Sequence, residues 1–191
     1  MTSSNSSSNS EEEVISELVL TPATISAYTH KDSPFHVCNK TFENCLLIDL
    51  NMLYLQSCVV RNCIIAHSVI EQFFDCSMEN TLIYNNRINT INACDFKYSS
   101  LTECNLRNSD IDNSSFLMCH FTKTQLGSIW LCSTRFKDCM GDWESSVNNF
   151  VMIKSGVKVW DNNKWVTVKE HDINGLISLL NGISLESDNL D

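Results

Sequence analysis

Large apolar side chains recur at every fifth position through the central part of the chain. Between residues 91 and 136 the series has no gap: Ile91, Phe96, Leu101, Leu106, Ile111, Phe116, Phe121, Leu126, Leu131 and Phe136. An amphipathic helix repeats every 3.6 residues and a half-buried strand repeats every second residue, so neither produces this spacing. The pattern therefore indicates an internal repeat whose unit is five residues long.

A small side chain stands two residues before most of these apolar positions. The small residues are Cys94, Ser99, Cys104, Ser109, Ser114, Cys119, Thr124 and Thr134, with Ile129 as the one bulky exception. The chain has 10 cysteines, but it contains no Cys-x-x-Cys pair, and its histidines show no ligand spacing relative to the cysteines. We interpret the cysteines as small buried residues of the repeat, and we expect no metal and no cofactor.

The same unit continues upstream in a shifted phase. Its apolar positions are Phe42, Leu47, Leu55, Val60, Ile65, Ile70, Met78, Ile83 and Ile88. Three steps in the series, such as Ile70 to Met78, take eight residues instead of five. We expect a slip of three residues at each of these steps, absorbed at a corner of the fold. The phase before residue 55 stays open.

Units such as Cys94-Asp95-Phe96 and Cys104-Asn105-Leu106 resemble the motif of the pentapeptide-repeat proteins, as does Ser109-Asp110-Ile111. The resemblance covers residues 37–140. It implies an all-β fold, a right-handed quadrilateral β-helix in which one unit forms one side and four units form one coil. About five coils are then expected from a segment of this length.

Coils of such a helix stack at about 4.8 Å, so residues one coil apart lie directly over one another. We therefore expect Phe96, Phe116 and Phe136 to form one aromatic column. The pairs expected to stack in the same way are Leu101–Phe121, Leu106–Leu126 and Ile111–Leu131. The predicted structural core consists of Cys94, Phe96, Leu101, Cys104, Leu106, Ile111, Phe116, Cys119, Phe121, Leu126, Leu131 and Phe136.

The segments on either side of the repeat predict a division of the chain into five parts. These are a polar tail at 1–13, an N-terminal cap at 14–36, the β-helix at 37–140, a C-terminal cap at 141–182 and an acidic tail at 183–191. Residues 157–168 are predicted to form a β-hairpin that turns at Asp161–Lys164. Asp172 is predicted to N-cap a short helix that ends at Gly182.

Three tryptophans, Trp143, Trp160 and Trp165, fall in the predicted C-terminal cap. Two interpretations of them stay open. They seal the last coil, or they form a patch that binds a protein partner, because tryptophan is enriched at interface hot spots. They are the candidate partner-binding residues of the sequence.

Composition narrows the classes of function. The 191 residues carry 13 Lys+Arg against 23 Asp+Glu, a formal net charge of −10, which disfavours binding of nucleic acid through basic side chains. No apolar run approaches the roughly 18 residues of a membrane helix, so no membrane span is expected. The chain contains no catalytic motif, and burial should raise the pKa of thiols in an apolar interior. We expect no catalytic residue and no enzymatic activity.

The resemblance extends to function. Pentapeptide-repeat β-helices are similar to the partner-recruiting domains of type III secreted effectors, including HECT-like ubiquitin ligases of enteric pathogens. The Ser/Asn-rich residues 1–13 are similar to uncleaved export signals. The resemblance implies a non-enzymatic protein-interaction module that is secreted into the host cytoplasm without a cleaved signal peptide and binds a host protein, with ubiquitin signalling as one setting. Without export, the protein would stay in the bacterial cytoplasm.

Two other functions stay open. Some pentapeptide-repeat proteins mimic DNA and bind DNA gyrase, which requires an acidic face along the coil. Residues 36–140 hold ten acids and eight bases, a net charge of 8 − 10 = −2, so the sequence favours the effector hypothesis. The third possibility is a structural repeat protein with no dedicated partner.

Overall fold

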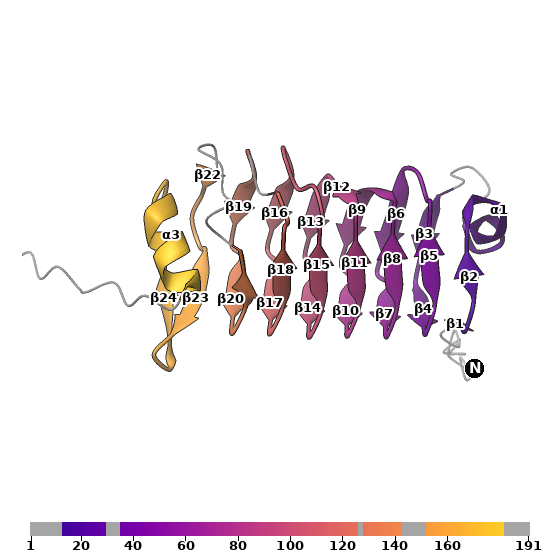
Figure 1. Cartoon of the computed structure of the whole chain (residues 1–191), viewed down its shortest axis with the longest axis horizontal. Coiled ribbons are helices and arrows are strands. Elements are labelled where there is room, and N and C mark those ends of the chain that lie inside the picture. The colour runs from indigo at the N-terminus through magenta and orange to yellow at the C-terminus, as the bar shows by residue number, and fades with distance from the viewer. Residues whose placement is uncertain (1–12, 30–34, 126–127, 143–151, 182–191) are drawn as a thin grey trace, which may run out of the picture.

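The computed structural model describes residues 13–29, 35–125, 128–142 and 152–181. These residues form a β-helix in which short strands stack in parallel along one axis, with a helix at each end (Figure 1). The fold predicted from the five-residue repeat is confirmed.

Each coil has four sides, which we number in chain order. The strands of side 1 are β1 (Glu13–Ser16), β4 (Lys40–Glu43), β7 (Val59–Arg61), β10 (Ser77–Glu79), β14 (Asp95–Lys97), β17 (Ser115–Leu117), β20 (Arg135–Lys137), β23 (Lys158–Asp161) and β24 (Lys164–Thr167). The strands of side 2 are β2 (Val19–Leu20), β5 (Leu46–Ile48), β8 (Ile64–Ala66), β11 (Leu82–Tyr84), β15 (Ser100–Thr102), β18 (His120–Thr122) and β21 (Met140–Gly141).

Side 3 is the least regular side. Its β12 (Arg87–Ile88) pairs with the start of β9, and isolated bridges join Arg87, Asn105 and Gln125. The strands of side 4 are β3 (His36–Cys38), β6 (Leu53–Gln56), β9 (Val69–Phe74), β13 (Thr90–Asn92), β16 (Asp110–Asp112), β19 (Trp130–Cys132) and β22 (Met152–Ile153). Strand β9 therefore spans the corner between sides 3 and 4.

Between Phe42 and Phe136 the coils have two lengths. Val60 pairs with Met78 in the neighbouring coil, so an early coil is eighteen positions long (78 − 60 = 18). Phe96 pairs with Phe116, so a later coil is twenty positions long (116 − 96 = 20), as four units of five require. The β-helix makes about six turns rather than the five expected. The stack is longer because β1 and β2 precede the predicted repeat segment and β22 and β23 follow it.

The shorter coils lose residues at the corner between sides 3 and 4. Ile70 and Phe73 are both fully buried and are three residues apart, whereas Leu106 and Ile111 occupy the same two sides of a later coil five residues apart. The slip predicted between Ile70 and Met78 lies at this corner, because the strand of side 4 begins two residues early.

The interior consists of columns of inward-pointing side chains. The rings of Phe96 and Phe116 are stacked with centroids 4.9 Å apart, and those of Phe116 and Phe136 are 5.2 Å apart, so the expected aromatic column is present. Leu101 pairs in register with Phe121. Ile111 pairs in the same way with Leu131. Every member of the predicted core is buried except Leu126, which lies outside the described residues.

The small residue of each unit has a second role besides its size. In most units its thiol or hydroxyl donates a hydrogen bond to a backbone carbonyl of the preceding coil, as in Thr124 Oγ1 to Leu101 O at 2.7 Å and Cys104 Sγ to Ile83 O at 3.2 Å. Asn86 occupies the same position and is buried, and its side-chain amide donates to Ile65 O at 2.7 Å. The position therefore favours a short donor, although the bulky Ile129 is also buried there.

The corners explain how a solenoid with 5 glycines can turn so often. One residue at most corners has a left-handed backbone conformation, for example Asn62 (φ 52°), Asn80 (φ 50°) and Asn113 (φ 48°). Asparagine tolerates this conformation better than most side chains because its short polar group can hydrogen-bond locally.

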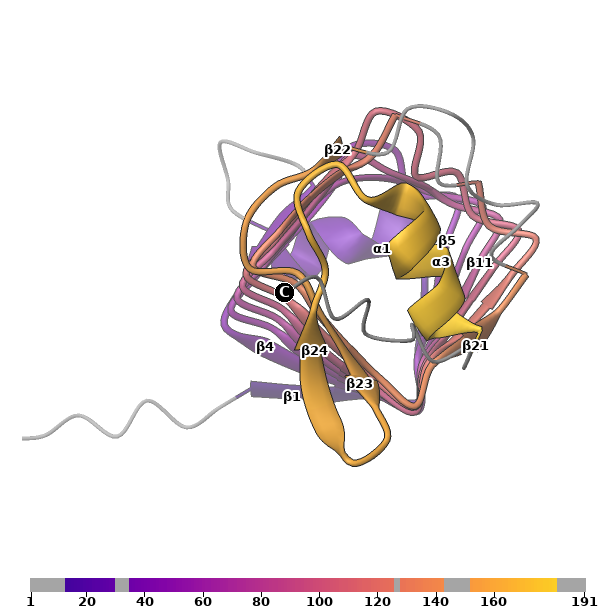
Figure 2. The same cartoon turned by 90° about the vertical axis from the view of Figure 1, so that its left-hand side faces the viewer.

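Both ends of the stack are covered. At the N-terminal end lie α1 (Pro22–Ile25) and the 3-10 helix η1 (Ser26–Tyr28), and Ile25 is fully buried. Residues 14–20 of the predicted cap, together with Glu13 of the predicted polar tail, instead contain strands β1 and β2 of the stack. At the C-terminal end, α3 (Ile173–Leu180) lies across the last coil (Figure 2).

The predicted C-terminal elements are present. Strands β23 and β24 form an antiparallel hairpin whose turn residues Asn162 and Asn163 both have positive φ, as a tight two-residue turn requires. The Asp172 carboxylate accepts a hydrogen bond from the backbone N–H of Gly175 at 2.8 Å and caps α3. Gly182, the predicted end of this helix, lies outside the described residues.

Candidate interaction surface

The repeat leaves the outward positions of each strand unconstrained. In a three-residue strand the central side chain points inward and the first and third point outward, because successive side chains alternate. On side 2 the central residues Leu47, Ile65 and Ile83 are fully buried. The outward residues of the same strands lie in two rows along the axis, and these rows determine what the molecule presents to solvent.

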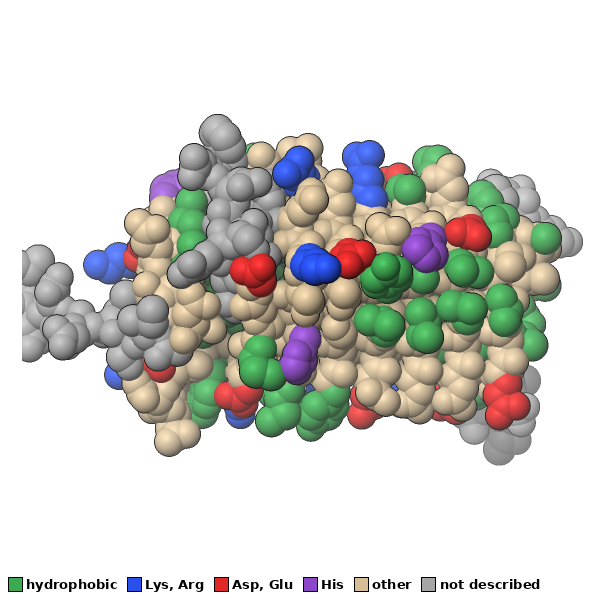
Figure 3. Space-filling view, in the orientation of Figure 1, with side chains coloured by type: hydrophobic (Ala, Val, Ile, Leu, Met, Phe, Trp, Pro, Cys, Tyr) green, Lys and Arg blue, Asp and Glu red, His purple; other side chains and the backbone are tan. Residues whose placement is uncertain are grey.

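The first row on side 2 is aliphatic in the early coils. Val19 pairs in register with Leu46, Leu46 with Ile64, and Ile64 with Leu82. The exposed fraction is 57% for Val19, 42% for Ile64 and 36% for Leu82. Hydrophobic side chains gather over β5, β8 and β11 in Figure 3. Leu46 in the same row is partly buried, and the exposed apolar side chains on either side of it make the row a candidate binding surface.

The second row consists of Ile48, Ala66 and Tyr84, which also pair in register. Ala66 is buried although its position is an outward one, and it does not belong to the core cluster. We call the two rows together the apolar ladder; its members are Val19, Leu46, Ile48, Ile64, Ala66, Leu82 and Tyr84.

Polar contacts hold Tyr84 in place at one edge of the apolar ladder. Its ring meets the His67 ring edge-on with centroids 5.4 Å apart, and His67 Nδ1 lies 2.9 Å from the Asn85 side-chain nitrogen. The Glu103 carboxylate accepts a hydrogen bond from the Tyr84 hydroxyl and raises the pKa of that phenol. The ring therefore presents a fixed apolar face with its hydroxyl turned toward the next coil.

Side 2 changes character at the next strand. Leu82 pairs with Ser100, whose hydroxyl lies 3.0 Å from the hydroxyl of Thr102. The following outward position is His120, and Lys123 lies 3.4 Å from the Glu103 carboxylate at the corner. The apolar ladder therefore ends after β11.

At its other end the apolar ladder adjoins a cavity of about 490 Å³. The cavity is bounded by Val19 and Leu20 of β2 and by Ala23, Ala27 and Tyr28 of the N-terminal cap, among others. Its walls are mostly apolar, so it extends the apolar ladder toward the N-terminal end of the stack.

Charge differs between the two halves of the described chain. Residues 13–85 carry seven acids and two bases outside the undescribed 30–34, whereas residues 86–142 without 126–127 carry six of each. The net charges are therefore 2 − 7 = −5 and 6 − 6 = 0. Arg61 lies between Glu43 and Glu79, at 3.3 and 3.7 Å, along the corner beside side 2. The apolar ladder lies in the acidic half.

The hairpin brings two of the predicted tryptophans together. Trp160 pairs with Trp165 and their ring centroids are 5.2 Å apart, with the Lys137 ammonium 4.6 Å from the Trp160 ring. Neither ring belongs to the core cluster, because Val159 and Val168 take the inward positions. Trp143 lies outside the described residues. A binding role for the tryptophans stays a prediction.

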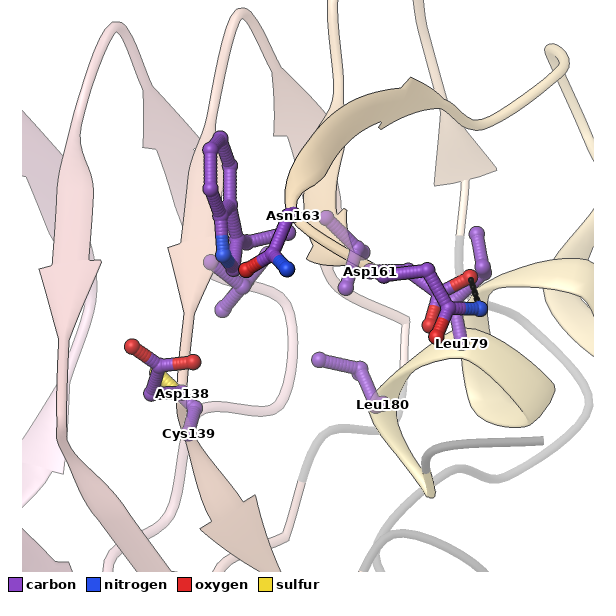
Figure 4. Close-up of a pocket in the computed structure, with 10 residues that line it drawn as sticks. Asp138, Cys139, Asp161, Asn163, Leu179 and Leu180 are labelled. Carbon is purple, nitrogen blue, oxygen red and sulfur yellow. Dashed lines mark hydrogen bonds between the residues drawn. The ribbon is translucent and has the colours of Figure 1, made fainter. Parts of the chain in front are cut away.

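A second cavity, of about 410 Å³, lies between the last coil, the hairpin and α3 (Figure 4). Its walls combine the Trp160 ring and Leu179 and Leu180 of α3 with the carboxylates of Asp138 and Asp161. It is therefore more polar than the cavity at the N-terminal end.

The thiols are placed for packing. Burial raises the pKa of Cys63 and of Cys104 to about 11, as expected. The expectation is wrong for Cys94, whose pKa is lowered by a hydrogen bond from the neighbouring Cys76 thiol, although its side chain is buried. Among the residues that the structure describes, no group of three or more potential ligands could hold a metal ion.

Comparisons with known proteins find a likeness in solved structures alone. No family model and no curated protein matches the chain. A trypsin-treated variant of QnrB1, a plasmid-mediated fluoroquinolone resistance protein, is 13% identical and aligns over 88% of this chain and 94% of its own, with a TM-score of 0.37.

Two further QnrB1 structures are similar at lower scores. Full-length QnrB1 is 13% identical and aligns over 88% of this chain and 97% of its own, with a TM-score of 0.25. Another trypsin-treated variant is 12% identical and aligns over 88% of this chain and 94% of its own, with a TM-score of 0.26. At such scores the likeness identifies neither a function nor a binding residue. No helix in the described ranges is long and apolar enough to cross a membrane.

Sequence reasoning missed the apolar ladder. Its members look like unremarkable apolar residues beside the inward positions, because Leu46, Ile64 and Leu82 each precede a core residue. The detectable pattern is the constant step between them (64 − 46 = 18 and 82 − 64 = 18), which equals one short coil. A search at the coil length, rather than at the unit length, would have found them.

Proposed function

We propose that this protein is a non-enzymatic protein-binding solenoid and that the apolar ladder is its binding surface. The proposal rests on one observation: a registered double row of apolar side chains lies on side 2 in the early coils and stops at Ser100. Burying apolar surface contributes about 25 cal/mol per Å², so such a row favours association. The thiols are buried, and the recurring positions within each unit serve packing and stacking. Both features support a function without catalysis.

Affinity capture with a matched pair of variants tests the proposal. Leu82 on side 2 and Phe74 on side 4 have nearly equal exposed fractions, 36% and 37%. A partner that uses the apolar ladder should be captured by wild type and by Phe74→Asp, and lost with Leu82→Asp. If Leu82→Asp retains every partner that wild type captures, the apolar ladder is not the binding surface.

The effector hypothesis is a more specific proposal, because it states where this binding occurs. It holds that residues 1–30 direct export through a type III apparatus and that the partner is a host protein, in ubiquitin signalling or elsewhere. A reporter fused to residues 1–30 should be exported by a strain with an active apparatus and retained by a strain without one. Retention in both strains would leave the protein in the bacterial cytoplasm.

The gyrase-binding alternative requires a different kind of surface. A DNA mimic needs an acidic face along the stack, whereas the later coils carry equal numbers of acids and bases. We therefore expect no effect of the protein on gyrase supercoiling. Inhibition of supercoiling at sub-micromolar protein would favour the alternative.

A further inference from the structure

The apolar ladder consists of two parallel rows that run along the axis of the stack. Its two rows are two residues apart on each strand, about 6.6 Å, and between them lie the backbones of inward residues such as Ile65 and Ile83. The rungs follow one another at about 4.8 Å, so the step from Val19 to Leu82 covers about 14 Å.

The backbone of side 2 offers an occupant no hydrogen bonds. The N–H groups of the ladder strands donate along the axis to the preceding coil, as in Leu46 N to Leu18 O, Ile64 N to Cys45 O and Leu82 N to Cys63 O, each at 2.9 Å. An extended peptide lying on the rows would bury its own N–H and C=O groups without partners, which is costly. An α-helix satisfies these groups internally, so a helix is the favoured occupant.

The dimensions fit a short helix. A helix rises 1.5 Å per residue, so about ten residues, or about three turns, cover the length of the apolar ladder. The footprint, about 14 Å by about 10 Å, is on the order of 140 Å², whereas a stable protein–protein interface buries about 800 Å² on each partner. A second copy of this chain therefore gains too little from this surface, and a single helical segment suits it.

The surrounding charge determines the flanks of such a helix. Glu17 and Asp49 lie at corners of side 2, and Glu43 and Glu79 lie along its border with side 1 with Arg61 between them, so these five side chains carry a net charge of 1 − 4 = −3. The early coils have a net charge of 2 − 7 = −5. Lys and Arg on the flanks of a bound helix would be attracted to this rim, and acidic flanks would be repelled. The chain's own residues 1–12 are polar and acidic, so they match neither requirement.

We infer that the apolar ladder binds an amphipathic α-helix of another protein, about three turns long, with its apolar stripe on the ladder and Lys or Arg on both flanks. The inference rests on the proposed function and adds the chemistry of the partner. Apolar residues at i, i+3, i+4 and i+7 of the partner would contact successive rungs.

Selection from a displayed library of random 16-residue peptides tests the inference with the full chain as bait. We expect enriched peptides to repeat apolar residues with the helical period and to carry excess Lys and Arg. Synthesised peptides, measured by fluorescence anisotropy, should bind Leu82→Asp about tenfold more weakly than wild type, or weaker still. Tenfold corresponds to a loss of about 1.4 kcal/mol in binding free energy, which the loss of one central interface residue can cause. Phe74→Asp should bind as wild type does.

The outcomes separate the two claims. Enriched peptides with a period of two, or with acidic flanks, that still lose affinity for Leu82→Asp would overturn the helix inference and leave the proposed function standing. Peptides that bind Leu82→Asp as tightly as wild type would overturn both. Failure to enrich any peptide would overturn the helix inference. Circular dichroism and thermal unfolding of both variants establish that they are folded.

Discussion

The two halves of side 2 share one interior and differ in their exterior. Under β5, β8 and β11 the core residues are Leu47, Ile65 and Ile83, and under β15 and β18 they are Leu101 and Phe121, all buried. Outside, the early strands carry the apolar ladder in an acidic half, and the later strands carry serine, threonine and histidine in a neutral half.

This difference teaches that fold and surface are specified by separate positions of the same five-residue unit. The central residue and the small donor two residues before it contact the interior, so both halves keep them. The outward residues contact neither the core nor the stacking backbone, so they vary without cost to the fold. Function in such a molecule is expected where the outward residues depart from a mixed polar surface.

The largest expected effect is the same in both halves, because it concerns the interior. Phe116→Ala in the later coils should cost about 3–5 kcal/mol of unfolding free energy, and Met78→Ala in the earlier coils about 2–5 kcal/mol, since each opens a cavity in a packed column. Denaturant unfolding measures both. A loss below about 1 kcal/mol for Phe116→Ala would mean that its ring is not packed between Phe96 and Phe136.

The corners should give a smaller effect. Asn113 has a left-handed backbone (φ 48°), which a β-branched residue adopts with strain, so Asn113→Val should lower the unfolding free energy by about 1–2 kcal/mol. Asn113→Gly is the matched control, because glycine adopts this conformation freely. Equal losses for the two variants would show that the side chain of Asn113, and not its backbone conformation, stabilises the corner.

The smallest expected effect on stability belongs to the surface positions that distinguish the halves. Leu82→Ser and Ser100→Leu should each change the unfolding free energy by no more than about 0.5 kcal/mol, since both side chains point outward. Their effects on binding should be opposite: Leu82→Ser shortens the apolar ladder by one rung and weakens helical peptides, and Ser100→Leu extends it by one rung and strengthens them. If both variants bind such peptides equally, the boundary between β11 and β15 has no functional meaning.

Much of the fold could be predicted because the repeat is local. The spacing of Phe96, Phe116 and Phe136 predicts their column, since two coils of four units each separate them by a fixed number of residues. The hairpin turn at Asn162 and Asn163 is likewise a local pattern of turn residues. The strands at residues 13–20 escaped prediction because their units lack the small donor that marks the repeat elsewhere.

The candidate site could not be predicted in the same way. Tryptophans attract attention as interface residues, and Trp160 and Trp165 are indeed on the surface, next to each other on the hairpin. Leu46, Ile64 and Leu82 of the apolar ladder are ordinary aliphatic residues one short coil apart in the sequence, and that distance becomes meaningful after the length of the short coil is known. Before residue 55 even the phase of the repeat was open.

The repeat in the sequence specifies the interior: a large side chain stands at every fifth position with a small residue two positions earlier, and the resemblance to pentapeptide-repeat proteins implies the four-sided coil that buries both. Tertiary structure decided where each coil closes, because Phe73 reaches side 4 three residues after Ile70 and makes the early coils shorter than four full units. Coil length determines which outward residues become neighbours. Leu46, Ile64 and Leu82 therefore form a row because the coils stack. No local segment of the sequence encodes that row.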